Sequence, residues 1–186
     1  MARQAKVHPI LSTARLRLRQ FRADDAEAMH AIYSDPVAMR FWDTPAHTRR
    51  IESERAVRNM VECTPSYYRC WAVADAGSDR CLGMVNYHDG HIRSRRVTIG
   101  YIIDPAQQRR GIATEAVSAL LDFCFGELAL HRVQALIDPD NVASRGLVEK
   151  LGFRNEGVLR DNMRVGEIWH DNVLYALLAG ERGGEG

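Results

Sequence analysis

The chain has 186 residues, of which 46% are hydrophobic and 26% charged, and its formal net charge is +1. These values are typical of one soluble globular domain, so we expect a single domain over residues 1–186 with its core at about 10–180. A net charge this small provides no broad field for nucleic acid or a membrane surface. No apolar run reaches the ~20 residues of a membrane span. The N-terminal stretch lacks the apolar segment of a secretory signal peptide. We predict a cytoplasmic protein, monomeric or homodimeric.

The four cysteines, at positions 63, 70, 81 and 124, are spread through the chain. Their spacing matches neither the paired cysteines of zinc sites nor the dense framework of small disulfide-bonded domains. We therefore expect reduced thiols and no metal site.

The first third of the sequence predicts a strand followed by two helices. Residues 15–19 read Arg-Leu-Arg-Leu-Arg, and this alternation indicates a strand with its arginines on a solvated face. Helical spacing follows from Asp25 to the Asp35-Pro36 pair and again over residues 48–62. The loop between these helices carries Phe41 and Trp42, which either close the edge of the core or border a substrate groove.

The rest of the chain predicts a mixed α/β fold with a central sheet of six to seven strands. Strands at 69–74, 82–87 and 96–103 are joined by short turns, which favours an antiparallel meander. A long amphipathic helix follows Gly111, and the strand at 131–137 after it requires a crossover, which favours parallel pairing. A short helix over 142–151 and a closing hairpin, 154–162 with 167–178, complete the order. No repeat, linker or second domain interrupts it.

The stretch before the long helix is a candidate anion site. Arg109 and Arg110 precede Gly111, where the helix opens. The first N–H groups of a helix lack partners within it, and arginines there oppose the helix dipole unless an anion lies between. A solvated turn in which Gly111 relieves a tight backbone is the alternative.

Residues 108–113, Gln-Arg-Arg-Gly-Ile-Ala, fit the Q/R-x-x-G-x-G/A motif, and the chain here resembles the GCN5-related N-acetyltransferases (GNAT). Asn141 with Ser144, and Lys150-Leu151-Gly152-Phe153 after them, resemble the branch that acetylates ribosomal-protein N-termini. The resemblance covers about 11–178. It implies the GNAT-like fold, a mostly antiparallel sheet with a splayed parallel pair in its middle, and acetyl-CoA as cosubstrate without a metal.

The resemblance also implies roles for individual residues. Ser144, at the start of the short helix, is the candidate general acid that protonates the departing thiolate. The Ile102 backbone N–H is the candidate donor to the thioester oxygen. A bulge at Gly100 would expose the backbone groups that bind pantetheine. The cofactor-binding residues implied are Tyr101, Ile102, Ile103, Gln108, Arg109, Arg110, Gly111, Ile112, Ala113, Thr114, Asn141 and Ser144. The substrate-binding residues implied are Phe41, Trp42 and Tyr87.

The general base is the point where the sequence departs from the family pattern. Many relatives have a glutamate two residues before Gly100-Tyr101, where this chain has Thr98, and the second glutamate expected in the ribosomal branch falls near Met163. The remaining candidates are Asp161, Glu167, His88, His91 and His170, or a water relay.

We therefore predict an N-acetyltransferase that moves acetyl from acetyl-CoA to a primary amine by direct attack in a ternary complex. A protein N-terminal amine is the first choice of acceptor, and a small amine, polyamine or aminoglycoside is the alternative. A non-catalytic acyl-CoA sensor is the alternative of another class. A doubly wound nucleotide-binding domain is disfavoured because it requires alternating parallel βα units.

Overall fold

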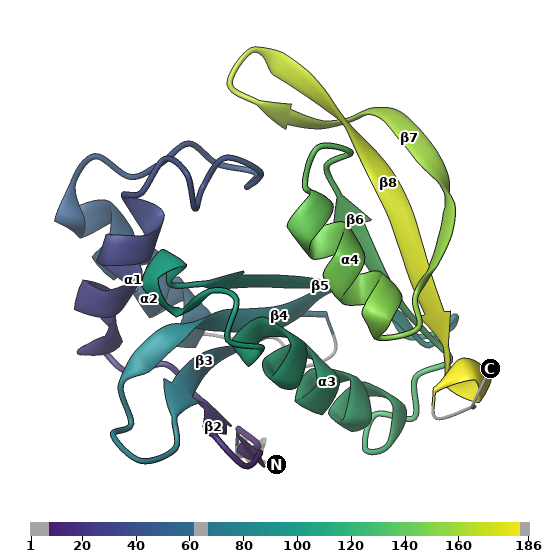
Figure 1. Cartoon of the computed structure of the whole chain (residues 1–186), viewed down its shortest axis with the longest axis horizontal. Coiled ribbons are helices and arrows are strands. Elements are labelled where there is room, and N and C mark those ends of the chain that lie inside the picture. Colours follow the sequence, from purple (N-terminus) through teal and green to yellow (C-terminus); the bar gives the residue numbers. More distant parts are fainter. Residues whose placement is uncertain (1–7, 62–66, 183–186) are drawn as a thin grey trace, which may run out of the picture.

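The computed structural model describes residues 8–61 and 67–182, which form one eight-stranded sheet with helices on both faces (Figure 1). The strands are β1 (Leu11–Ser12), β2 (Leu16–Arg19), β3 (Arg69–Asp75), β4 (Cys81–His91), β5 (Arg96–Ile103), β6 (Arg132–Ile137), β7 (Arg154–Val165) and β8 (Ile168–Leu178). The helices are α1 (Asp25–Tyr33), α2 (Arg50–Val61), α3 (Ile112–Phe125) and α4 (Val142–Lys150), with 3-10 turns at Pro105–Gln107 and Ala179–Glu181. The predicted mixed α/β class is confirmed.

The strand order is β1-β2-β3-β4-β5-β6-β8-β7, and every neighbouring pair is antiparallel except β5 and β6. The predicted meander is the β3-β4-β5 part, and the closing hairpin is β7 with β8. The two-residue β1 extends the sheet beyond the expected six to seven strands. Its shortness gives it no alternating pattern that a sequence could display.

The parallel pair is joined over a short stretch only. β5 and β6 pair at Arg96–Thr98 with Arg132–Gln134, where Gln134 Nε2 donates to Thr98 Oγ1 at 3.0 Å. From Ile99 to Ile103, β5 pairs with β4 alone among the described residues. We call the resulting opening between the two strands the wedge. Figure 1 shows β5 and β6 diverging there, with α4 beside β6.

The bulge expected at Gly100 is absent. β4 and β5 keep one register from Gly83↔Ile103 to His88↔Thr98, and the irregularity lies between His88 and His91. Gly100 instead permits a close approach, because a Cβ there would lie 2.9 Å from the Asn86 Oδ1 atom. The wedge therefore comes from the end of β6 pairing, not from a bulge in β5.

The core is divided between the two faces of the sheet. Trp71 and Val73 of β3 pack with α3 and α4 on one face, whereas Cys70 and Ala72 pack with α1 and α2 on the other. Because both faces are covered, β3 is buried along nearly all its length. The helices thus hold the central strands from both sides and leave the wedge at the C-terminal end of β5.

The expectation of a solvated arginine face on β2 is wrong for Arg19. Its side chain is 5% exposed, and it donates to Asp25 from Nη1 at 2.8 Å and from Nη2 at 2.9 Å, and to Asp79 Oδ1 at 3.0 Å. A guanidinium buried between two carboxylates is stabilised by charge-assisted hydrogen bonds. Strict alternation could not reveal this pairing, because Asp79 lies in a distant turn.

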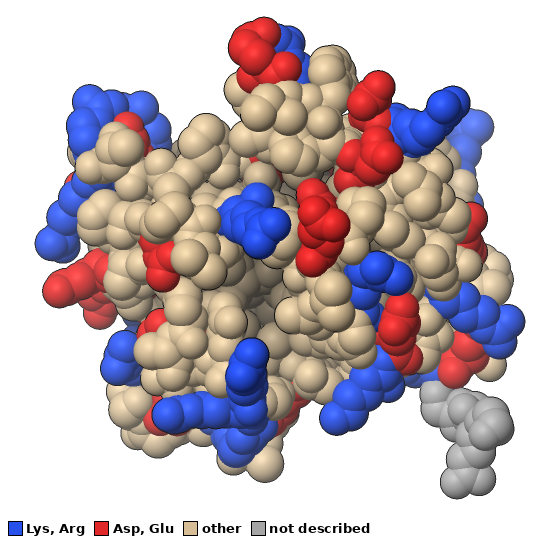
Figure 2. Space-filling view, turned by 45° about the horizontal axis from the view of Figure 1, so that its top comes forward, with Lys and Arg blue, Asp and Glu red and all other residues tan. Residues whose placement is uncertain are grey.

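None of the helices in the described ranges is long and apolar enough to cross a membrane. Figure 2 shows basic and acidic side chains interspersed over the face that it displays. This distribution agrees with the small net charge of the sequence.

Candidate active site

The turn between β5 and α3 presents unpaired backbone N–H groups. Arg109 and Gly111 both have positive φ, 59° and 75°, which turns the chain sharply into the helix. In the described residues, the N–H groups of Ile112, Ala113 and Thr114 have no hydrogen-bond acceptor. Three free N–H groups at the positive end of a 14-residue helix suit an anion. The arginines at 109 and 110 are exposed beside them.

A clamp from the segment between β1 and β2 holds this turn in place. Arg15 donates to the Glu115 carboxylate from Nε at 2.7 Å and to the Arg110 carbonyl from Nη1 at 3.0 Å. Thr13 Oγ1 donates to the same carboxylate at 2.5 Å. Burial opposes ionisation of Glu115, but the hydrogen bonds from Thr13 and Arg15 outweigh it and lower the pKa of the carboxyl. Sequence reasoning missed this clamp, because its partners are 100 residues apart.

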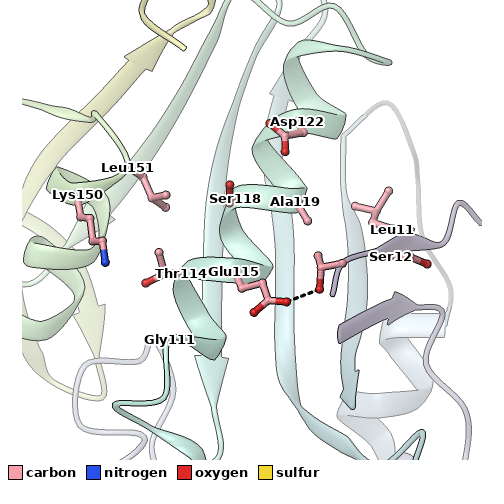
Figure 3. A pocket seen from close by; sticks show the side chains of 11 residues that line it. Leu11, Ser12, Gly111, Thr114, Glu115, Ser118, Ala119, Asp122, Lys150 and Leu151 are labelled. Carbon is pink, nitrogen blue, oxygen red and sulfur yellow. Dashed lines mark hydrogen bonds between the residues drawn. The ribbon is translucent and has the colours of Figure 1, made fainter. Parts of the chain in front are cut away.

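A cavity of about 530 Å³ extends from the turn along α3. We call it the α3 pocket. Figure 3 shows α3 side chains facing it between the β1 edge and the end of α4, where Lys150 and Leu151 lie. Its lining residues are Leu11, Ser12, Thr13, Gly111, Thr114, Glu115, Ser118, Ala119, Asp122, Lys150 and Leu151. Gly111 belongs to both the turn and the pocket, so a ligand bound at the turn could continue into the pocket.

The wedge brings Tyr101 of β5 to the first turn of α4. The Tyr101 hydroxyl donates to the Ser144 carbonyl oxygen at 3.3 Å, and burial raises the pKa of that hydroxyl to about 12. Asn141 caps α4, because its Oδ1 accepts from the Ser144 N–H at 3.1 Å. The Ser144 hydroxyl has no hydrogen-bond partner among the described residues. It is therefore available at the wedge and is not needed for the cap.

A second cavity of about 220 Å³ lies where the α1–α2 loop faces the β7–β8 hairpin and the turn after β6. We call it the aromatic pocket. Phe41 and Trp42 line it, as do Met163 and His170 from the hairpin and Asp138 directly after β6. Its other lining residues are Pro36, Met39, Arg40, Thr44, Pro45, Ala46 and Val165.

A carboxylate and an imidazole lie close together in the aromatic pocket. Asp138 Oδ2 lies 3.7 Å from His170 Nδ1, and the two side chains are 14% and 34% exposed. Asp138 was not identified as a candidate from the sequence. Its place immediately after a buried strand was the signal that could have identified it.

The other candidates for catalysis and substrate binding lie elsewhere. Tyr87 is 1% exposed, with its ring 5.8 Å from that of Trp71 in the core. Thr98 is 2% exposed and bonded to Gln134. Glu167 is 91% exposed and paired with Arg164 at 2.6 Å. The remaining candidates outside the pocket are His88, His91 and Asp161.

The thiols and acidic groups add no further chemistry to the site. Cys70, Cys81 and Cys124 are buried, and burial raises the pKa of the Cys81 and Cys124 thiols to about 12. Cys63 lies outside the described residues. Within those residues no group of three or more His, Cys, Asp or Glu side chains could hold a metal ion.

Comparison with known proteins agrees with this geometry. Residues 15–154 match the model of the acetyltransferase (GNAT) domain. The uncharacterized N-acetyltransferase YoaA of Bacillus subtilis (strain 168) is 32% identical over 175 residues, which cover 91% of this chain and 97% of YoaA. YdaF of the same organism, named for a suspected ribosomal N-acetyltransferase activity, is 38% identical over 103 residues, 55% of this chain and 56% of YdaF.

A solved structure supports the same assignment. The crystal structure of a GNAT-family acetyltransferase from Bacillus anthracis superposes with a TM-score of 0.84 and is 28% identical, covering 93% of this chain and all of that one. The family model covers the turn, the Arg15–Glu115 pair and the wedge. The chain therefore belongs to the GNAT family of acetyltransferases.

Proposed function

We propose that this protein transfers acetyl from acetyl-CoA to a protein N-terminal amine, by direct attack within a ternary complex. The observation that carries the cofactor part is the turn at Arg109–Gly111, where three unpaired N–H groups and two arginines converge. A pyrophosphate is the anion that this arrangement fits, because it accepts several hydrogen bonds at once. The ribosomal N-acetyltransferase activity for which the relative YdaF is named and the ribosomal-branch motif support a protein N-terminus as the acceptor.

The wedge is where the pantetheine arm fits. Backbone groups of Tyr101 and Ile103 face the open side of β5 and can bond its amides as a neighbouring strand would, whereas those of Ile102 face β4. The Ile102 N–H, predicted from the sequence as the donor to the thioester oxygen, faces Met84 of β4, because the Asp104–Leu82 hydrogen bond and the strand register make Ile102 and Met84 a hydrogen-bonded pair. The proposed donor is therefore the Tyr101 N–H, which is on the open side of β5. The Asn141 side chain already accepts from Ser144, so its amide NH₂ remains to contact the arm.

The α3 pocket is the proposed place for the rest of the cofactor. It begins at Gly111 and ends at Lys150, whose ammonium can meet a phosphate. The remaining cofactor contacts proposed are Gln108, Ile112, Ala113 and Thr114. No covalent acyl-enzyme is needed, because the amine can attack the thioester directly.

The test is CoA binding by calorimetry. Wild type should bind with low micromolar Kd, and the double variant Arg109→Ala/Arg110→Ala should bind at least 10-fold more weakly with a smaller salt dependence, since two cations near the phosphates are lost. Gly111→Val should also weaken binding, because its φ of 75° is strained for valine.

The matched control removes the same charge elsewhere. Arg55 and Arg58 are exposed on α2, and Arg55→Ala/Arg58→Ala should bind CoA as wild type does. Equal affinity and salt slope in all of these proteins would refute the turn as the CoA site. CoA binding without thiol release from acetyl-CoA, over a panel of peptides and small amines, would instead favour the acyl-CoA sensor.

A further inference from the structure

We propose that Asp138 and His170 form the amine site of this enzyme, with Asp138 binding the acceptor's ammonium group and His170 removing its proton, and that the site accepts a monocationic amine rather than a polyamine. This inference rests on the proposed function. It identifies the general base of the reaction, which that proposal left open, and the class of amine that is the substrate. The observation that motivates it is the aromatic pocket, into which three separate segments of the chain bring an acid, an imidazole and two aromatic rings.

The turn that contains Asp138 leads directly into α4, the helix that borders the wedge. The Asn141 N–H donates to the Asp138 carbonyl at 2.9 Å, and the Asp140 N–H donates to Asp138 Oδ1 at 2.8 Å. Arg145 Nη1 holds the same turn by donating to the Pro139 carbonyl at 3.1 Å. The aromatic pocket and the first turn of α4 are thus connected through four residues, so an amine in the pocket would lie next to the wedge.

The chemistry of the pair suits a proton acceptor. One oxygen of Asp138 is occupied by Asp140, and the other faces His170 Nδ1 at 3.7 Å. A carboxylate on one side of an imidazole orients the ring and offsets the charge that appears when the other nitrogen takes a proton. That other nitrogen, Nε2, has no hydrogen-bond partner among the described residues. An ammonium can donate to this nitrogen while the nearby carboxylate attracts its positive charge.

The balanced step assigns each proton. The ammonium gives one proton to His170 Nε2, and the neutral nitrogen attacks the acetyl carbonyl carbon to form the C–N bond. As the C–S bond breaks, the electron pair leaves on sulfur, which takes a proton from the Ser144 hydroxyl. The serine regains a proton that the attacking nitrogen loses, and His170 releases the first proton to solvent. The products are one amide, one CoA thiol and one solvent proton.

The charged residues that line the pocket determine which acceptor it selects, by the number of positive charges that the acceptor has. Its charged or titratable side chains are Arg40, Asp138 and His170, so the pocket is lined by one carboxylate and one arginine. Arg40 also lies over the Phe41 ring at 4.9 Å. One carboxylate matches one ammonium, and further cations on a polyamine would meet Arg40 without acidic partners. Trp42 and Phe41 offer apolar surface to the group next to the amine, as the first residue of a peptide would require.

The first experiment measures amine binding without turnover. A tripeptide amide with a free N-terminus and uncharged side chains is titrated by calorimetry into CoA-saturated protein, beside its N-acetylated form and spermidine. We expect the free-amine peptide to bind at least 10-fold more tightly than either comparison ligand. Asp138→Asn should lose at least 10-fold in peptide affinity and bind CoA normally. Equal peptide binding by wild type and Asp138→Asn, or tighter binding of spermidine, would overturn the proposal.

The second experiment separates a base from a structural residue. His170→Gln should lower kcat about 10²-fold near pH 7, with peptide KM changed less than threefold. The deficit should shrink as pH rises above ~8, where an α-amine is already neutral. A deficit independent of pH would mean that His170 only shapes the pocket. His131→Gln is the matched control, because His131 is exposed before the opposite end of β6.

The outcomes distinguish this proposal from the one it rests on. A wild-type protein that fails to bind CoA would overturn both. A protein that binds CoA and acetylates peptides, but does so unchanged in Asp138→Asn and His170→Gln, would overturn the amine site alone.

Discussion

The backbone of Ser144 is hydrogen-bonded at both its N–H and its carbonyl, whereas its side chain, within the described ranges, is not. Its N–H and its carbonyl are bonded to Asn141 and Tyr101, whereas its hydroxyl is free of such contacts among the described residues. If the hydroxyl protonates the leaving thiolate, Ser144→Ala should lower kcat by roughly 10²–10⁴-fold. CoA affinity and melting temperature should stay close to wild type, because the cap and the turn are intact. Steady-state kinetics, calorimetry and thermal melting on this one variant test the role.

Asn141→Ala provides the contrasting variant at the same helix end. It removes the acceptor for the Ser144 N–H and should cost about 1 kcal/mol of stability. An unchanged kcat in Ser144→Ala, with a lowered melting temperature, would identify Ser144 as structural only.

Arg19 is the buried cation on which two carboxylates depend. Arg19→Met would leave the Asp25 carboxylate, whose side chain is 4% exposed, without its partner, and should lower the free energy of unfolding by about 3–5 kcal/mol. Urea unfolding measures this loss. Arg17 lies on the same strand but is exposed, so Arg17→Met should change stability by no more than about 0.5 kcal/mol.

The Arg19 network also predicts a pH dependence. The hydrogen bond from Arg19 lowers the pKa of Asp79, and Arg22 adds to the effect. The ionised carboxylate therefore stabilises the fold above its unfolded pKa of about 3.8, and the contribution is lost as pH falls through the lower folded value. Accordingly, the stability difference between wild type and Arg19→Met should narrow below pH 4. A difference that stays constant from pH 7 to pH 3 would contradict this interpretation.

At the scale of elements, the clamp couples the sheet edge to the start of α3. Glu115→Gln would keep the shape of the side chain but remove the charge that Arg15 binds at 2.6 Å. We expect a loss of about 0.5–1 kcal/mol in stability, since Arg15 is half exposed, and a several-fold weaker CoA affinity as the turn loosens. Calorimetry and denaturant unfolding check both.

The clamp has its own control and pH signature. Glu127 is exposed after the end of α3, and Glu127→Gln should change neither property. Because the folded pKa of Glu115 is lowered, its contribution is present above its unfolded value of about 4.5 and disappears as pH falls through the folded value. Equal CoA affinity in wild type and Glu115→Gln at pH 7 would show that the turn holds its conformation without the clamp.

Sequence patterns predicted the order of elements because each signal is local. Alternation predicted β2, turn residues predicted the meander, and the spacing after Gly111 predicted α3. The burial of Arg19 and the pairing of Asp138 with His170 depend on contacts between distant segments, which no local pattern contains. The resemblance to a family predicted the wedge and the turn, and it placed Phe41, Trp42 and the position of Met163 near the substrate, which all line the aromatic pocket. It did not identify Asp138, the partner of His170 there.

At the scale of the whole molecule, the sheet consists of two parts with a narrow connection. β1–β5 with α1–α3 form one part, and β6–β8 with α4 form the other. Within the sheet, three residue pairs join the two parts. Outside it, the Tyr101–Ser144 hydrogen bond, the Arg182–Asp122 ion pair and a shared hydrophobic core also connect them. A ligand in the wedge would contact both parts at once.

The short seam has a consequence for local unfolding. Strands joined by few backbone pairs are the first to separate in local opening, and a ligand that bridges them suppresses the opening. Amide hydrogen exchange in β6 and α4 should therefore be faster than in β3 and β4 of the free protein, and CoA should slow it by at least 10-fold. Thr98→Val, which removes the Gln134 hydrogen bond at the last pair of the seam, should speed exchange in β6 without affecting β3. The cofactor of this enzyme would then also serve as the cross-link that makes its two halves unfold together.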